Sequence, residues 1–115
     1  MDQLHLNILG VEYVVHVLTA EQDSNLDECA GYCDHTTHRI VIEDQGLKQD
    51  GFCDWLEIQK RILRHEIIHA FLFESGLGAD ASYIAEGETH PELMVDWFAR
   101  QAPKIYAVYK TAGII

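Results

Sequence analysis

Five consecutive residues, His65-Glu66-Ile67-Ile68-His69, have the types and spacing needed for metal-assisted hydrolysis. Residues four apart share one face of an α-helix, so the two imidazoles can bind the same metal ion. Glu66 lies beside that face, where its carboxylate can act as a general base on water. The run matches the zinc-hydrolase signature H-E-x-x-H, which supplies two ligands and the base.

The motif is short, and composition alone gives roughly a 4% chance of a random match. The surrounding sequence must therefore supply a helix. No Gly or Pro interrupts residues 54–75, Asp54 is a suitable N-cap, and Glu57 follows it at the capping-box spacing. Apolar residues recur at helical spacing, and Gly76 and Gly78 follow. The pattern predicts a helix over residues 54–75.

Catalytic zinc sites normally use three protein ligands and a water molecule. The candidates for the third ligand lie in or just before a second helix, which is expected to begin near His90 or Pro91. Glu92 is the predicted ligand, and Asp96, one turn later, is expected to accept a hydrogen bond from a ligand histidine. His90 is an alternative ligand or a hydrogen-bond donor to the transition state, and Glu88 and Asp96 are further alternatives as ligands.

Other residues that can do chemistry are weaker candidates. Three tyrosines are possible oxyanion stabilisers, although each is more often a core or surface residue: Tyr32, Tyr83 and Tyr106. Two cysteines and two histidines have a spacing unlike that of zinc knuckles or fingers, which argues against a second site: Cys29, Cys33, His35 and His38. We expect Cys33 to be a small buried side chain and both histidines to lie in a turn.

The remaining pattern predicts the elements that must position this motif. Strands are expected over residues 3–9 and 11–18, separated at Gly10, and over 30–34 and 39–43 as a hairpin with its turn at 35–38. Residues 20–28 are expected to be a loop. The last helix should run to at least Ala102, with Pro103 kinking or restarting it before a final turn or two over 105–111. The order predicts an α+β domain in which a small antiparallel sheet packs against the zinc helix and a C-terminal helix.

Two longer strings, HEIIHAFLFESGL and HPELMVDWFARQAP, resemble the ImmA/IrrE-type metallopeptidases, a zincin-like HExxH family common in phages and mobile elements. In that family a glutamate ligand on the following helix precedes Phe-Ala and, later, Pro. Here these positions are Glu92, Phe98, Ala99 and Pro103, although the asparagine usual after the alanine is absent. Small phage proteins of this type also have a Gly-Tyr-Cys-Asp strand before the zinc helix, as at residues 31–34. The resemblance covers about residues 30–103.

The resemblance implies that His65, His69 and Glu92 bind Zn²⁺ and that Glu66 is the catalytic base of a minimal zincin-like fold. SprT-like proteases, a neighbouring family, use a third histidine instead of a glutamate. In zincin-like folds an edge strand pairs with extended substrate, and residues 39–43 are expected to be that edge. The expected substrate is a specific cytoplasmic protein of a phage or its host.

Two other functions remain open. The first is a non-catalytic, zinc-stabilised module that binds a host or phage protein, in which zinc holds the two helices together. The second is a metal-free interaction domain. Retention of Glu66 favours catalysis, because a structural metal site has no need of that acid.

Composition sets broader limits. The length suits one domain, residues 1–115. Eight basic and 19 acidic residues give a formal charge of −11, which repels phosphate backbones, so nucleic acid is not an expected partner. A preference for basic peptides is a less favoured interpretation of that charge than simple solubility. No signal peptide or membrane span is evident, and three scattered cysteines suit reduced thiols, so a cytoplasmic protein is expected.

Overall fold

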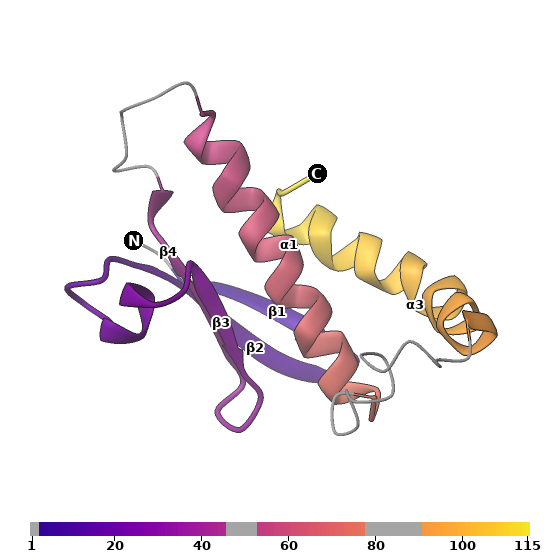
Figure 1. Cartoon of the computed structure of the whole chain (residues 1–115). Coiled ribbons are helices and arrows are strands. Elements are labelled where there is room, and N and C mark those ends of the chain that lie inside the picture. Colours follow the sequence, from indigo (N-terminus) through magenta and orange to yellow (C-terminus); the bar gives the residue numbers. More distant parts are fainter. Residues whose placement is uncertain (1–2, 46–52, 78–90) are drawn as a thin grey trace.

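Four strands and two long helices make up the described part of the fold. The computed structural model describes residues 3–45, 53–77 and 91–115, and only the backbone at residues 91–96 and 99. The elements are β1 (Leu4–Ile8), β2 (Val11–Leu18), the short 3-10 helix η1 (Ser24–Asp27), β3 (Gly31–Asp34), β4 (Arg39–Glu43), α1 (Trp55–Glu74) and α3 (Pro91–Ala112). Both helices pack on one face of the sheet, with α1 over β3 and β4 and α3 nearer β1 (Figure 1). The predicted α+β class is confirmed.

The sheet has the order β1-β2-β4-β3 and is mixed. β1 pairs with β2, and β3 with β4, in antiparallel fashion, whereas β2 and β4 are parallel. The expectation of a wholly antiparallel sheet is therefore wrong. The expectation that Arg39–Glu43 forms an edge is also wrong, because β4 lies between β2 and β3. The physical reason is that Ile40, Val41 and Ile42 are all buried, and a run that is apolar on both faces belongs in the interior of a sheet.

Two tight turns set the hairpins. Leu9 and Gly10 have φ angles of 52° and 92°, as a two-residue β1–β2 turn requires, so the predicted break at Gly10 is confirmed. In the β3–β4 turn, the Asp34 carboxylate accepts hydrogen bonds from the backbone N–H groups of Thr36 and Thr37, at 3.0 and 3.4 Å. His38, at φ 56°, completes this turn.

The helix that carries HEIIH has the predicted extent. The Asp54 carboxylate caps it by accepting a hydrogen bond from the Glu57 N–H at 3.1 Å. The Glu57 carboxylate contacts Arg64 at 3.0 Å, farther along the same helix. α1 ends at Glu74, and Gly76 follows with φ 88°, a left-handed conformation that glycine adopts without strain. Gly78 lies outside the described residues.

The second long helix begins at Pro91, as predicted, and continues through Pro103 to Ala112. The helix therefore does not restart after Pro103. Proline removes one backbone hydrogen bond, but buried side chains on both sides of Pro103 hold the helix to the core: Trp97, Ile105 and Val108. Neither long helix of the described chain is of the length and apolarity needed to span a membrane.

Among the residues whose side chains are described, two hydrogen bonds tie α3 to α1 and its C-cap. The Trp97 indole N–H donates to the Ser75 hydroxyl at 3.1 Å, beside the end of α1. The Tyr109 hydroxyl donates to the Arg64 carbonyl at 3.1 Å, near the middle of α1. One apolar core joins both helices to the inner face of the sheet, and its largest fully buried members include Tyr13, Phe71 and Ile67.

Candidate metal centre

His65 and His69 extend from one face of α1 with their Nε2 atoms 3.2 Å apart. A tetrahedral zinc ion with Zn–N bonds of about 2.0–2.1 Å holds two nitrogens roughly 3.3 Å apart. Both histidine residues are exposed, so an ion can reach them from solvent. The spacing of the nitrogens and the chemistry of the donors therefore fit zinc.

The environment of His69 favours its neutral form. Burial, followed by the charge of His65, lowers the pKa of the His69 imidazole below its ordinary value. A neutral imidazole is the form that binds a metal ion.

Glu66, between the two histidines in sequence, is buried, with 6% of its surface exposed. Burial raises the pKa of its carboxyl group, and the neighbouring His65 acts in the opposite direction. The side chain lies on the β3 side of α1, where it lines a groove together with Ala30 and Gly31. A carboxylate in such a position is poised to accept a proton.

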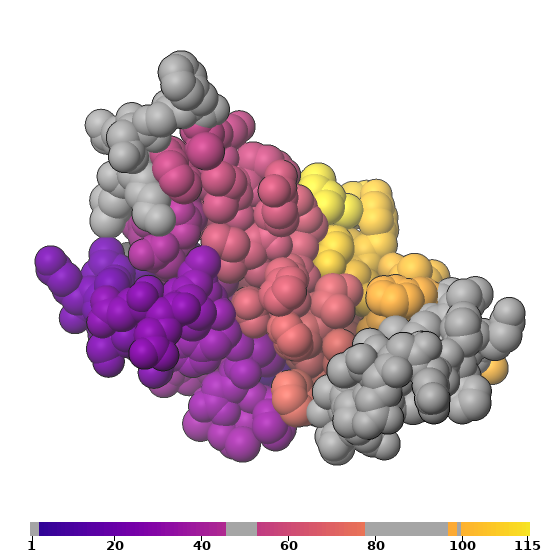
Figure 2. All heavy atoms as spheres, in the orientation of Figure 1, coloured from indigo at the N-terminus to yellow at the C-terminus, as the bar shows by residue number. Residues whose placement is uncertain are grey.

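Glu66 opens onto a groove of about 350 Å³ between α1 and the start of β3, which we call the inner groove. Its lining residues are Ala30, Gly31, Arg61, Ile62, His65 and Glu66. Figure 2 shows atoms of α1 at the molecular surface that faces the viewer, next to atoms of the segment that includes β3. The groove therefore gives solvent access to the acid and to one histidine of the motif.

β3 lies close along α1 because residue 31 is a glycine. A Cβ at Gly31 would come within 2.9 Å of the Ile62 Cγ2 atom and 3.1 Å of the Val41 carbonyl oxygen. At the other end of the strand, the His35 ring stacks on Phe73, with centroids 3.9 Å apart and planes 9° from parallel. Phe73 is one turn beyond His69, so β3 and its turn follow the helix past both histidines.

β3 has one unpaired edge among the described residues. The Glu43 N–H donates to the Ala30 carbonyl at 2.9 Å, so Ala30 and Glu43 form a hydrogen-bonded pair. Along an antiparallel ladder such pairs alternate with pairs that are not hydrogen-bonded. By that alternation Tyr32 and Asp34 bond to β4, whereas the backbone groups of Gly31 and Cys33 point to the free side. The edge beside α1 is thus β3, and not β4 as the sequence suggested.

The candidates for the third ligand lie on α3 or just before it. Glu92 and Asp96 lie in the first turns of α3, where only the backbone is described, and His90 and Glu88 lie outside the described residues. Within the part of the chain whose side chains are described, no three possible metal ligands come together. Trp97, bonded to Ser75, holds this part of α3 to the end of α1. The assignment of Glu92 stays a prediction.

The tyrosine candidates do not gather at the histidines. Tyr32 is the register partner of Val41 on the outer face of the sheet, away from α1, and its hydroxyl donates to Asp23. Tyr106 is exposed on α3, where the Lys110 ammonium lies 6.0 Å from its ring centre. Tyr83 lies outside the described residues.

The turn histidines lie where they were predicted, whereas Cys33, predicted to be buried, is only partly buried. Cys33 is partly buried, and burial, aided by the charge of Glu66, raises its thiol pKa to about 12. Cys29 is exposed and donates to the Asn25 carbonyl. His38 lies in the β3–β4 turn, and its ring centre is 5.3 Å from that of Tyr13.

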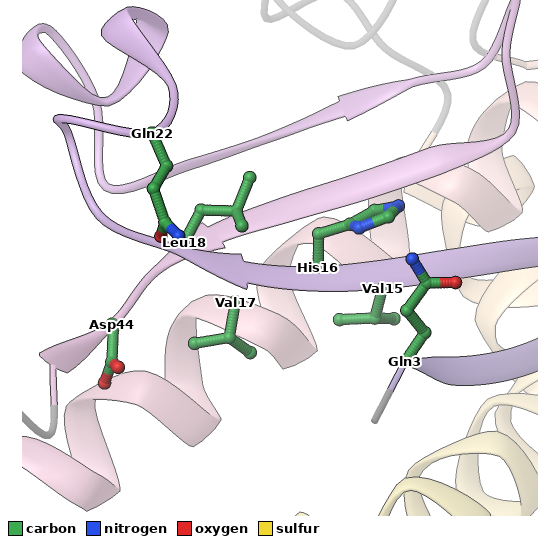
Figure 3. A pocket seen from close by; sticks show the side chains of 7 residues that line it. All are labelled: Gln3, Val15, His16, Val17, Leu18, Gln22 and Asp44. Carbon is green, nitrogen blue, oxygen red and sulfur yellow. The ribbon is translucent and has the colours of Figure 1, made fainter. Parts of the chain in front are cut away.

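A second hollow, of about 340 Å³, lies at the end of β2 (Figure 3). His16 and Leu18 lie on the opposite side of the strand from Val15 and Val17, as the alternation of a strand requires. Burial lowers the pKa of His16, and the charges of Arg39 and His5 add to that effect. None of the HEIIH residues lines this hollow.

Three residues of the site escaped prediction from the sequence. Arg61 lies one turn before His65 and Phe73 one turn after His69, so the helical spacing of four residues already placed them on the same face as the histidines. Gly31 carried only a weaker signal, as a glycine within a strand pattern. No protein-family model matches the chain, and comparisons with curated proteins and with solved structures found no match.

Proposed function

We propose that the chain is a zinc-dependent peptidase in which His65, His69 and Glu92 hold the metal. The observation that carries this proposal is the 3.2 Å separation of the two Nε2 atoms beside the buried Glu66. Glu92 is proposed as the third ligand because of its place on α3 and the resemblance to ImmA/IrrE-type enzymes. Bound zinc would polarise the substrate carbonyl and acidify water, which is the chemistry that the protein side chains lack.

Glu66 performs the proton transfers. Its carboxylate accepts a proton from the water that attacks the scissile carbonyl, and then donates that proton to the departing amine nitrogen. The position between the two histidines and at the wall of the inner groove supports this role. A structural metal site would not require a buried acid there.

The free edge of β3 supports an extended peptide as the substrate. The outward backbone groups of Gly31 and Cys33 can pair with the main chain of such a peptide. That pairing would lay the peptide beside the inner groove, where Glu66 and His65 lie. The resemblance favours a specific phage or host protein in the cytoplasm as the natural source of this peptide.

A decisive test combines zinc content with hydrolysis of a degenerate fluorogenic peptide library. We expect one zinc per chain in the wild type and in Glu66→Gln, and loss of zinc in His65→Ala and His69→Ala. His5→Ala is the matched control, because His5 is exposed on β1 and should leave the zinc content unchanged. Glu66→Gln should lower the rate of hydrolysis by about 10²–10⁴-fold.

The same samples test the remaining ligand and the rival function. Glu92→Ala should weaken zinc binding by about tenfold or more, and unchanged affinity would move the third ligand to His90, Asp96 or Glu88. A zinc-loaded wild type that cleaves no peptide, with four protein ligands by X-ray absorption, would contradict hydrolysis. That result would establish the zinc-stabilised interaction module instead.

A further inference from the structure

Another cavity lies along the free edge of β3, and no residue of the HEIIH motif lines it. It has a volume of about 520 Å³, and we call it the outer hollow. It is lined by Asn25, Glu28, Cys29, Tyr32, Cys33, Asp34 and His35. Four of these residues are consecutive, and side chains of consecutive strand residues alternate between faces. The hollow therefore runs along the edge of the strand, bounded on its other side by residues of the loop that follows β2.

The outer hollow carries two carboxylates. Hydrogen bonds from Thr36 and Thr37 lower the pKa of Asp34 to about 2, so this group is ionised at neutral pH. Arg39 is the register partner of Asp34 on β4. Glu28 comes from the loop, is exposed, and has no hydrogen bond or ion pair to its carboxylate among the described residues. Glu28 is thus the carboxylate available to a ligand.

The geometry relates this hollow to a peptide that pairs with β3. Residues of an added strand that lie beside Tyr32 or Asp34 project to the same outer face as those residues. Their neighbours project to the other face, toward α1 and the inner groove. Alternate side chains of one peptide therefore meet two different environments: the inner groove at Glu66, and the outer hollow at Glu28.

We infer that the outer hollow is a specificity subsite for a lysine or arginine side chain of the bound peptide, and that Glu28 selects that side chain. This inference rests on the proposed function, since it takes the bound peptide to be the substrate. The charge of −11 on the whole chain acts in the same sense, because it attracts basic segments over a longer range.

The test measures binding separately from cleavage. Zinc-loaded Glu66→Gln protein is titrated into fluorescein-labelled degenerate octapeptides that carry either Lys or Gln at one fixed position, scanned along the peptide. The same titrations are made with Glu28→Gln added, and with Glu21→Gln added as the matched control. Glu21 is an exposed acid in the same loop that does not line the outer hollow.

We expect Lys to be preferred over Gln by about threefold to fivefold at low salt, as for an exposed ion pair. Glu28→Gln should abolish this preference, and Glu21→Gln should retain it. Salt at about 1 M should also remove the preference, because it screens an exposed ion pair. Absence of a Lys preference, or equal loss in both variants, overturns the subsite.

Cleavage of the same peptides by protein with Glu66 intact separates the two proposals. Cleavage without a Lys preference contradicts the subsite alone. A Lys preference that depends on Glu28, in a protein that cleaves none of the peptides, contradicts hydrolysis but retains the subsite as a binding site.

A thiol supplies an independent readout. Cys29 lines the outer hollow, whereas Cys53, which is also exposed, does not. At saturation, the Lys peptides should lower the rate at which a disulfide reagent modifies Cys29. The rate of modification of Cys53 should be unchanged. Equal rates at Cys29 with and without peptide would place the peptide elsewhere.

Discussion

Gly31 on β3 and Ile62 on α1 are in such close contact that a single added methyl group would overlap: a Cβ at Gly31 would lie 2.9 Å from Ile62 Cγ2. Both residues line the inner groove together with Glu66. The distance between strand and helix at the candidate site is therefore set by the absence of a side chain at position 31. The contact lies one turn before the first histidine of the motif.

Gly31→Ala should displace β3 from α1 and lower the free energy of unfolding by about 1–3 kcal/mol. Urea denaturation measures this change. The double variant Gly31→Ala with Ile62→Ala removes the clashing methyl group, so its loss should be smaller than the sum of the two single losses. If the loss of unfolding free energy in the double variant equals the sum of the two single losses, the two residues do not limit how closely β3 approaches α1.

Ile114 and Ile115 offer a matched pair for the packing of the C-terminal segment. Ile114 is buried, and its carbonyl accepts a hydrogen bond from Arg64 at 2.7 Å, whereas Ile115 is 61% exposed. Ile114→Ala should lower the free energy of unfolding by about 2–4 kcal/mol, and Ile115→Ala by less than about 0.5 kcal/mol. Equal effects in urea denaturation would contradict the packing of Ile114 between the sheet and α1.

The three thiols should react at different rates. The Cys33 thiol, with its pKa raised to about 12, holds little thiolate at mildly alkaline pH and is partly buried, whereas Cys29 and Cys53 are exposed. Titration with a coloured disulfide reagent should show two fast thiols and one that is slower by about tenfold or more. Cys33→Ser should remove only the slow phase, and loss of a fast phase in that variant would contradict the placement.

Asp34 makes stability depend on pH in the acid range. Its folded-state pKa, near 2, is below the ordinary value of 3.8, so its contribution is present above about pH 4 and is lost as the pH falls toward 2. The stability difference between wild type and Asp34→Asn should be constant above about pH 4 and shrink on acidification. Glu21→Gln serves as the control, and a difference that grew at low pH would contradict the role of Asp34.

The helix that carries the histidines was predictable because its determinants are local. Asp54 as cap, the uninterrupted run of helix formers and Gly76 beyond the end act over a few residues. The same locality brings His65 and His69 together, since one turn of helix is enough to place both nitrogens.

The position of β4 was not predicted, because strand order depends on partners distant in sequence. The hairpin with β3 was evident from the turn, but the pairing with β2 joins residues about 25 positions apart. The burial of Ile40, Val41 and Ile42 together is the signal that favours an interior strand. The third metal ligand presents the same difficulty, because Glu92 lies on a different helix from the two histidines.

The sheet consists of two hairpins, β1–β2 and β3–β4, and the parallel pairing of β2 with β4 is the seam that joins them. Each hairpin can form from neighbouring residues. Pairing of β2 with β4 is expected to be slower, because it must close the long stretch of chain between the two strands. The histidine pair, Glu66 and the free strand edge all come from the hairpin and helix on the C-terminal side of that seam. The described part of the candidate site therefore comes from one stretch of the chain, from β3 to α1, and its contacts do not depend on the slower pairing of β2 with β4, whereas the predicted ligand Glu92 comes from α3.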